Sequence, residues 1–345
     1  CIVLLAMGLS RRLTVVAVLL GNSWSFSILL IISSTDAVEE PAGDDCSLMQ
    51  VQHHRTKAGA RELFQACSKV VPVTGSQRPM PALGFGTCCR DGASGQPLID
   101  STKIWLSSGG RLVDTAEAYE NQPDIAVAIR DSGVPREEIW ITSKVNTHDK
   151  RSRSDVVASI DRSLQELGVD YIDLMLLHDP LGAGPPAELF RGLLEAKKSG
   201  RIRNAGVSNY NQTLVEELVS ATGEAPAVNQ IEFHPWSAQW TKNFVKWMQG
   251  RGIAVTAYSV LGGKKVQAQD DAVAALADKY KVTNAQVLVQ WALDKGVAPL
   301  VGASSQEHIW EDLNCSGLQH LSEVDALYLE ISERPENFQE RFFGK

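Results

Sequence analysis

The chain has 345 residues, 44% of them hydrophobic and 21% charged, which is enough for one large domain or two modest ones. Its 41 acidic residues outnumber its 33 basic ones, for a net charge of -8, and no run of Lys or Arg interrupts this acidity. We therefore expect no nucleic-acid partner, because proteins that bind nucleic acid carry a basic surface. The six cysteines lack metal-ligand spacing, and the adjacent Cys88 and Cys89 match neither a zinc knuckle nor a redox Cys-x-x-Cys motif. No metal site is expected.

The first 36 residues have the charge layout of a targeting segment. The chain starts with Cys1, and Met7 would open a leader in which two arginines precede an uncharged stretch, residues 13–34, followed by acidic residues. This layout predicts a signal peptide or signal anchor over residues 1–36. The stretch is long enough to span a bilayer, but its polar residues favour a cleaved signal. A leader without any role is the alternative. Residues 37–67 are polar and weakly periodic, which predicts a disordered linker.

From Met80 onward, short apolar runs alternate with amphipathic stretches. The runs predict strands over residues 81–88, 111–116, 139–145, 172–178, 202–208, 227–233, 253–259 and 297–303. The stretches predict helices over residues 97–108, 123–132, 154–167, 187–199, 212–221, 241–249, 271–280, 284–294 and 306–314. Nearly continuous apolar strands are typical of a parallel sheet covered on both faces.

Eight strand–helix units predict an α/β fold of the (β/α)8 TIM barrel type over residues 68–345, preceded by the hydrophobic leader and the disordered linker. A doubly wound open sheet is the main competitor. Its dinucleotide-binding version would carry a Gly-x-Gly-x-x-Gly turn after the first strand, and the pair Gly84 and Gly86 lacks the third glycine at that offset.

Four motifs place polar residues at predicted strand ends, where such a barrel carries its active site. They are Asp114-Thr-Ala-Glu-Ala-Tyr119, Thr142-Ser-Lys144, Leu176-Leu-His178 and Gly206-Val-Ser-Asn209. A free phenol has a pKa of about 10 and protonates an alkoxide poorly at neutral pH. A buried Lys144 ammonium beside Tyr119 would lower that pKa, and Asp114 would keep the ammonium charged. His178 could donate a hydrogen bond to the substrate oxygen.

Each of these four residues taken alone has a simpler explanation as a packing or structural group. A tyrosine in a loop usually packs, and a buried Asp–Lys pair is often only a satisfied ion pair. Their occurrence together on adjacent strand ends favours a site that protonates a carbonyl oxygen while a hydride arrives from the other side.

These motifs closely resemble those of the aldo-keto reductase family, in order and in spacing, from residue 79 to residue 343. Three further strings share the resemblance: Leu83-Gly-Phe-Gly-Thr87, Asn229-Gln-Ile-Glu-Phe-His-Pro235 and Ala257-Tyr-Ser259. The resemblance implies a nicotinamide-dependent reductase on a (β/α)8 barrel. By position, Asp114, Tyr119, Lys144 and His178 match the catalytic tetrad of the family, with Tyr119 as general acid.

The resemblance also implies a cofactor site. Ser208, Asn209 and Gln230 match the residues that hold the nicotinamide carboxamide, and Tyr258 matches the aromatic residue that stacks on the nicotinamide ring. Ser259 and Leu261 match residues along the pyrophosphate. The adenosine end corresponds to Gly302, Ala303, Ser304, Ser305, His308, Glu311 and Asp312.

The chain departs from the family pattern at this adenosine end. The usual Lys-Ser is Gly302-Ala303 and the following Arg is His308, so the basic groups that neutralise the adenosine 2′-phosphate are missing. Ser304, Ser305 and the amino end of the last predicted helix could still hold a phosphate. We expect NADPH as the cofactor, with NADH as the alternative. Asp179 replaces the common Trp after His178, which suits a more polar substrate.

The predicted function is the reduction of aldehydes or ketones to alcohols by NAD(P)H. One alternative is a non-catalytic nicotinamide-cofactor-binding regulatory subunit of a membrane partner, which the apolar N-terminal stretch keeps open. Another barrel enzyme, such as a hydrolase or aldolase, is a third interpretation. We expect a monomer that binds a small-molecule carbonyl substrate and contacts a membrane through its N-terminal segment only.

The leader predicts a secretory route or an organelle reached through an N-terminal signal. An NADPH-using reductase with unpaired cysteines instead suits a reducing compartment. A plastid or similar organelle would satisfy both observations, and a cytoplasmic location is the alternative.

Overall fold

The computed structural model describes residues 13–22, 25–34, 69–262, 271–314 and 320–332. Residues 1–54 and 55–345 form two separate compact units. In the first unit, β1 (Leu13–Asn22) and β2 (Ser25–Ser34) pair as an antiparallel hairpin. The predicted signal segment falls partly on this hairpin, and the predicted linker lies outside the described residues. Within the described ranges, no helix is long and apolar enough to cross a bilayer.

The second unit contains a closed barrel of eight parallel strands. The strands follow one another around the ring in chain order, and the last pairs with the first. They are β5 (Gly84–Gly86), β6 (Leu112–Asp114), β7 (Trp140–Val145), β8 (Ile172–Leu177), β9 (Ile202–Ser208), β10 (Val228–Glu232), β11 (Ala254–Tyr258) and β12 (Ala298–Val301). The predicted (β/α)8 TIM barrel is confirmed.

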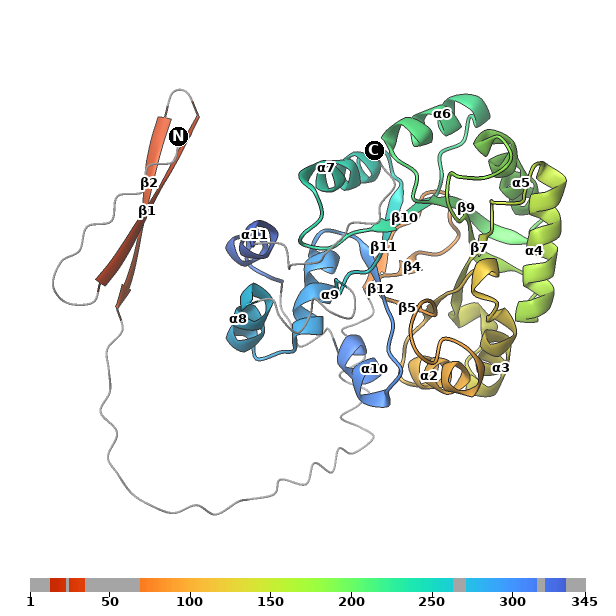
Figure 1. The fold of residues 1–345 in the computed structure, drawn as a ribbon, viewed down its shortest axis with the longest axis horizontal. Coiled ribbons are helices and arrows are strands. Elements are labelled where there is room, and N and C mark those ends of the chain that lie inside the picture. The colour runs from red at the N-terminus through yellow and green to blue at the C-terminus, as the bar shows by residue number, and fades with distance from the viewer. Residues whose placement is uncertain (1–12, 23–24, 35–68, 263–270, 315–319, 333–345) are drawn as a thin grey trace, which may run out of the picture. The chain divides into compact units, whose positions relative to one another are not determined.

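Figure 1 shows the helices on the outside of the ring of strands. They are α2 (Gly95–Ser107), α3 (Gln122–Ser132), α4 (Arg153–Leu167), α5 (Pro186–Lys198), α6 (Gln212–Thr222), α7 (Gln239–Gln249), α8 (Asp271–Tyr280), α9 (Asn284–Asp294), α10 (Gln306–Leu313) and α11 (Glu323–Ile331). Two short 3-10 helices, η1 (Glu117–Tyr119) and η2 (Arg136–Glu138), and the helix α11 were not among the predicted elements.

Local capping explains where several helices begin and end. Ser152 accepts a hydrogen bond from the backbone of Asp155 and the Asp155 side chain accepts one from the backbone of Ser152, so this reciprocal pair starts α4. Gly168 ends the same helix in the left-handed conformation, with φ of 62°. Thr283 and Gln286 start α9 with the same reciprocal pair.

Alternate residues along each strand point to opposite sides and build two apolar clusters. In β8, Leu174 and Leu176 belong to the cluster inside the barrel. Met175 and Leu177 belong to the larger cluster between the strands and the surrounding helices. All four side chains are fully buried, so both faces of the strand are covered, as its continuous apolar sequence predicts.

The first predicted strand, residues 81–88, is wrong in extent. Met80–Pro81 forms β4, which pairs antiparallel with β3 (Val70–Val71), and only Gly84–Gly86 joins the barrel as β5. Met80 and Ala82 pack into the cluster inside the barrel, which the strands also line. The apolar run therefore continues from β4 into β5, and the hydrophobic pattern alone does not show that these are two strands.

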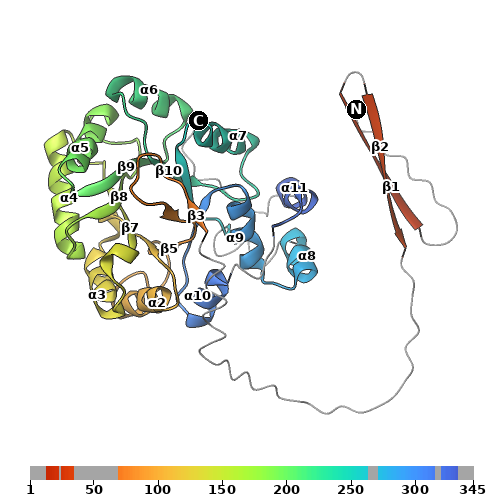
Figure 2. The same cartoon turned by 180° about the vertical axis from the view of Figure 1, so that it is seen from behind.

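The β3–β4 hairpin covers the amino end of the barrel. Thr74, in its turn, donates to the carbonyl oxygen of Gly252 just before β11 (2.7 Å), and Asn204 of β9 donates to Ser76 (3.2 Å). Arg78 pairs with Asp173 near the start of β8 (2.7 Å). Figure 2, the view from behind, shows β3 within the outline of the ring. The opposite, carboxyl end is left for the functional site.

Cys88 and Cys89, in the loop after β5, are joined by a disulfide bond. The interpretation that the cysteines are unpaired is therefore wrong for these two.

Candidate active site

Four predicted catalytic side chains meet at the carboxyl end of the barrel. Asp114 is the last residue of β6, Lys144 lies near the end of β7, and His178 directly follows β8. The Lys144 ammonium donates hydrogen bonds to Asp114 Oδ1 (2.5 Å), to the carbonyl oxygen of Thr115 (3.0 Å) and to the Tyr119 hydroxyl (3.2 Å). Because Lys144 is 1% exposed and Asp114 3% exposed, this ion pair is shielded from water.

The His178 and Tyr119 rings lie edge to face, with their centroids 5.6 Å apart. Burial, aided by the nearby charge of Lys144, lowers the pKa of His178 to about 4. The imidazole is therefore neutral at physiological pH and keeps one N–H group to donate.

The pKa of Tyr119 differs from the sequence-based prediction. Burial is the strongest influence and raises the pKa of the phenol above its ordinary value, and the opposing effect of Lys144 does not overcome it. The predicted net lowering is thus wrong. Burial would lower the pKa of Lys144, but Asp114 and Tyr119 together raise it. The phenol keeps its proton at neutral pH, and the charged ammonium beside it can stabilise a phenolate once that proton leaves.

The turn that carries Tyr119 is tied to its surroundings through Glu117. Glu117 Oε2 accepts hydrogen bonds from the backbone N–H of Asn146 (2.9 Å) and from the Ser159 hydroxyl (2.6 Å), and Oε1 accepts from Arg162 (3.1 Å). These contacts connect η1 to the loop after β7 and to α4. The position of the phenol is therefore set by more than its own loop.

The residues predicted to hold the nicotinamide form one hydrogen-bonded network. The Tyr258 hydroxyl donates to Asn209 Oδ1 (2.8 Å), and Asn209 Nδ2 donates to the Ser208 hydroxyl (3.1 Å) and to the carbonyl oxygen of His178 (3.3 Å). The Ser208 hydroxyl donates to the carbonyl oxygen of Gln230 (3.0 Å). The network therefore connects the carboxyl ends of the four strands β8, β9, β10 and β11, next to His178.

Backbone strain gathers in the same place. Asn209 and Ser259 adopt left-handed conformations, with φ of 62° and 54°, and Glu120, directly after Tyr119, has φ of 54°. Such residues cost on the order of 1 kcal/mol or more each and are held by surrounding contacts, most often at functional sites. All three follow strand ends on the carboxyl side of the barrel.

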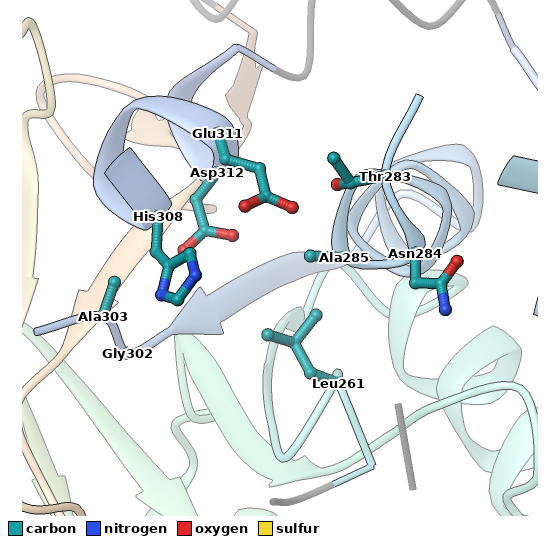
Figure 3. A pocket seen from close by; sticks show the side chains of 9 residues that line it. All are labelled: Leu261, Thr283, Asn284, Ala285, Gly302, Ala303, His308, Glu311 and Asp312. Atoms are coloured by element: carbon teal, nitrogen blue, oxygen red, sulfur yellow. The ribbon is translucent and has the colours of Figure 1, made fainter. Parts of the chain in front are cut away.

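A cavity of about 380 Å³ lies beside the end of β12, where the adenosine end of a cofactor was predicted. Figure 3 shows its lining residues, which come from the loops after β11 and β12, from the start of α9 and from α10. Six predicted residues line it: Leu261, Gly302, Ala303, His308, Glu311 and Asp312. Among the described residues, the lining contains two carboxyl groups, those of Glu311 and Asp312, and no Lys or Arg.

Asp312 is 4% exposed, and burial with the nearby Glu311 charge raises the pKa of its carboxyl group to about 8. At neutral pH this side chain is therefore mostly protonated and can donate as well as accept a hydrogen bond, as an amide would.

Ser304 and Ser305 do not line the cavity. The Ser304 hydroxyl donates to the carbonyl oxygen of Asp91 (3.1 Å), and the Ser305 hydroxyl accepts from the backbone N–H of His308 (3.2 Å) to cap α10. The prediction that these hydroxyls hold a phosphate has no support in their contacts.

Sequence reasoning missed three lining residues, Thr283, Asn284 and Ala285, at the amino end of α9. The capping sequence of this helix was visible, but only the fold brings the helix end next to the loop after β12. No group of three or more His, Cys, Asp or Glu side chains suited to a metal occurs among the described residues.

The residues present fit a nicotinamide dinucleotide. Three features lie at the carboxyl end of the barrel. They are a polar network that can hold a carboxamide, the acid–base residues Tyr119 and Lys144, and a separate cavity. Such an arrangement can deliver a proton to a carbonyl oxygen beside a hydride donor.

Comparison with known proteins gives the same assignment. The model of the aldo/keto reductase family matches residues 82–331. The chain is 34% identical to an NAD/NADP-dependent indole-3-acetaldehyde reductase of Schizosaccharomyces pombe, over 71% of this chain and 88% of that protein. It is 36% identical to the methylglyoxal reductase DkgB of Escherichia coli O157:H7, over 70% of this chain and 88% of that protein.

Among solved structures, an aldo-keto reductase of Bombyx mori in complex with NADP superposes with a TM-score of 0.69. The two sequences are 28% identical, and the match covers 76% of this chain and 92% of that chain.

Proposed function

This chain belongs to the aldo/keto reductase family and is an NAD(P)H-dependent oxidoreductase acting on carbonyl compounds, and we propose the following roles for the residues of its site. Tyr119 protonates the carbonyl oxygen of an aldehyde or ketone, Lys144 stabilises the phenolate left behind, and Asp114 keeps Lys144 charged. The observation that carries this proposal is the Lys144 ammonium, which lies within hydrogen-bond distance of both the Asp114 carboxylate and the Tyr119 hydroxyl.

When bound, NAD(P)H supplies the hydride that reduces the carbonyl carbon. His178, neutral because of its lowered pKa, donates a hydrogen bond to the carbonyl oxygen and holds it near the phenol. Ser208, Asn209 and Gln230 orient the carboxamide, and Tyr258 stacks on the ring. Their mutual hydrogen bonds support this proposal, because a preorganised site loses little entropy when it binds.

The substrates we propose are small aldehydes and ketones, the class to which the substrates named for the relatives belong. Asp179 next to His178 supports a neutral and polar molecule over an anionic one. Its Oδ1 accepts hydrogen bonds from Thr147 (3.2 Å) and from the backbone of Leu181 (2.8 Å), so the negative charge is fixed in place. No relative named above supports the alternative of a non-catalytic regulatory subunit.

The test is the consumption of NADPH by the full chain with methylglyoxal and with 4-nitrobenzaldehyde. Tyr119→Phe removes the acidic proton and should lower kcat by about 100-fold or more while cofactor binding persists. Tyr171→Phe, at the amino end of the barrel, is the matched control and should keep its activity. Unchanged turnover in Tyr119→Phe would remove this residue from the proposed role.

For residues 1–36 we propose a targeting role, with the charge layout of the leader as support. For the folded unit we propose a monomer. Microscopy of the full chain tagged after Lys345 tests the first point, and a diffuse cytoplasmic tag would contradict it. Light scattering of the purified protein tests the second, since a mass of two chains would contradict the monomer.

A further inference from the structure

Arg90 lies in the loop after β5 with most of its guanidinium hydrogen-bonding capacity unused. Its guanidinium stacks over the Phe85 ring at 4.8 Å, and Nη1 donates to the carbonyl oxygen of Gly86 (3.0 Å). Nε and Nη2 are buried and make no hydrogen bond. Burial also lowers the pKa of Arg90. Native structures rarely leave buried N–H groups of a cation unsatisfied, and a ligand that completes them is one explanation.

Arg90 lies next to Gly302, one of the residues that line the cavity at the predicted adenosine end. A Cβ atom added to Gly302, which lines that cavity, would stand 3.5 Å from both Cδ and Nη1 of Arg90. Such a Cβ would meet the carbonyl oxygen of Gly86 at 3.3 Å and would only touch Arg90, so position 302 and the Arg90 side chain border the same space.

The two loops that meet here are joined by hydrogen bonding. The Ser304 hydroxyl, two residues after Gly302, donates to the carbonyl oxygen of Asp91, the residue after Arg90. This bond holds the Arg90 loop beside the loop that lines the cavity. The position of Arg90 is thus a property of the folded barrel and not of a free surface side chain.

The charges around the cavity indicate why a cation is needed beside it. Glu311 and Asp312 line the cavity, and none of its lining residues is Lys or Arg (Figure 3). Asp312 is mostly protonated at neutral pH, so the negative charge of the lining is that of Glu311, and this charge would repel the phosphate groups of a dinucleotide. Arg90 offers a planar fork of N–H groups, which matches the geometry of phosphate oxygens.

We propose that Arg90 binds a phosphate group of the nicotinamide cofactor and replaces, from another loop, the basic side chain that position 302 lacks. This inference rests on the cofactor use described under the proposed function. It adds a specificity-determining residue that the sequence motifs do not reveal, because residues 90 and 302 belong to the first and the last strand–helix units. In the bound state, Nε and Nη2 gain the partners that they lack in the free protein.

Binding of NADPH and NADH to the full chain, followed by quenching of tryptophan fluorescence, tests the proposal without requiring turnover. Arg90→Met keeps the contact with Phe85 and removes the charge. It should raise the Kd for NADPH by about tenfold or more, the size expected for one to two charge-assisted hydrogen bonds. Arg90→Lys should retain part of the affinity.

Arg251→Met is the matched control. Arg251 also stacks on an aromatic ring, that of Trp247 at 4.0 Å, but it lies at the amino end of the barrel. Its loss should leave both dissociation constants unchanged.

The two cofactors identify the phosphate. If Arg90→Met loses affinity for NADPH alone, Arg90 binds the 2′-phosphate. If it loses affinity for NADPH and NADH equally, Arg90 binds the pyrophosphate. Either result supports the proposal. Unchanged Kd values for both cofactors in Arg90→Met would overturn it and leave Arg90 as a packing residue. Tight binding without turnover would instead contradict the proposed function alone.

A reciprocal variant separates charge from folding. Gly302 does not require a left-handed backbone, and a side chain there needs a shift of a few tenths of an ångström away from the Gly86 carbonyl oxygen in addition to the space left by a shortened Arg90. Arg90→Met combined with Gly302→Lys should recover NADPH affinity to within about threefold of the wild type, since one cation replaces the other in the same space. A double variant that binds no better than Arg90→Met would contradict the idea that the two positions share one role.

Discussion

Gln230 Nε2 lies 2.8 Å from Asp114 Oδ2, so the carboxylate that holds Lys144 also accepts a hydrogen bond from a residue of the proposed cofactor site. The remaining oxygen, Oδ1, is engaged by the Lys144 ammonium. Both carboxylate oxygens of Asp114 are thus used. The orientation of the Gln230 amide is fixed by this bond, which leaves its Oε1 as an acceptor for a carboxamide N–H.

Replacing Gln230 by Glu should therefore disturb both the ion pair and the cofactor site. A second carboxylate beside Asp114 removes a hydrogen bond to a charged group and adds like-charge repulsion, so we expect a loss of about 2–3 kcal/mol in unfolding free energy at pH 7. The loss should shrink at pH 5 as one carboxyl group takes up a proton. Gln230→Met, which lacks the charge, should show no such recovery in urea denaturation.

Glu117→Ala should lower kcat by about tenfold and leave the Kd for the cofactor unchanged. The reason is that Glu117 fixes the turn bearing Tyr119, and a misplaced proton donor slows the chemical step more than binding. Steady-state kinetics and cofactor titration would separate these effects. Glu120→Ala, in the same turn but exposed, serves as the control. Equal loss of kcat in both variants would contradict a positioning role for Glu117.

His178 makes stability depend on acid pH. Its pKa of about 4 in the folded state lies below the ordinary value of 6.5. As the pH falls, the imidazole is protonated in the unfolded chain before it is protonated in the folded one. Its contribution to the unfolding free energy is therefore fully present above pH 6.5 and decreases as the pH falls toward 4. The decrease amounts to about 3 kcal/mol at most. Urea unfolding at pH 7, 5.5 and 4.5 should show it in the wild type and a smaller slope in His178→Asn. Parallel slopes in the two proteins would exclude His178 as the cause.

Asp312 makes stability depend on pH in the opposite direction. Its pKa is raised from 3.8 to about 8 in the folded state, so its contribution is complete below pH 4 and is lost as the pH rises toward 8. Asp312→Asn should remove this dependence and raise the Tm at pH 8 relative to the wild type. Glu311→Gln should weaken the dependence only partly, since burial is the larger cause. A wild-type and an Asp312→Asn protein with the same Tm at pH 8 would contradict this account.

The barrel and the meeting of Asp114, Lys144 and His178 were predictable from the sequence because a parallel barrel built in chain order brings all strand ends to one rim. Once the strands were located, the rim residues followed. The helix predicted over residues 154–167 ends in the structure at Leu167, before Gly168, because a glycine stop is a local effect.

Other features depend on contacts that no local pattern encodes. The pKa of Tyr119 is decided by how deeply the phenol is buried, and this outweighs the Lys144 charge on which the prediction relied. The hydroxyls of Ser304 and Ser305 bond to the protein, and no local pattern identifies these partners. Arg90 meets Gly302 across the closure of the barrel, more than two hundred positions away along the chain.

The hairpin of β3 and β4 closes one end of the barrel. In the part of the chain that the structure describes, the amino end is covered and the interior is filled by apolar side chains, which leaves the carboxyl rim as the side for molecules to enter and leave. The cofactor and the carbonyl compound then share one entrance to the active site. If one of the two molecules reaches deeper than the other, it must bind first and leave last.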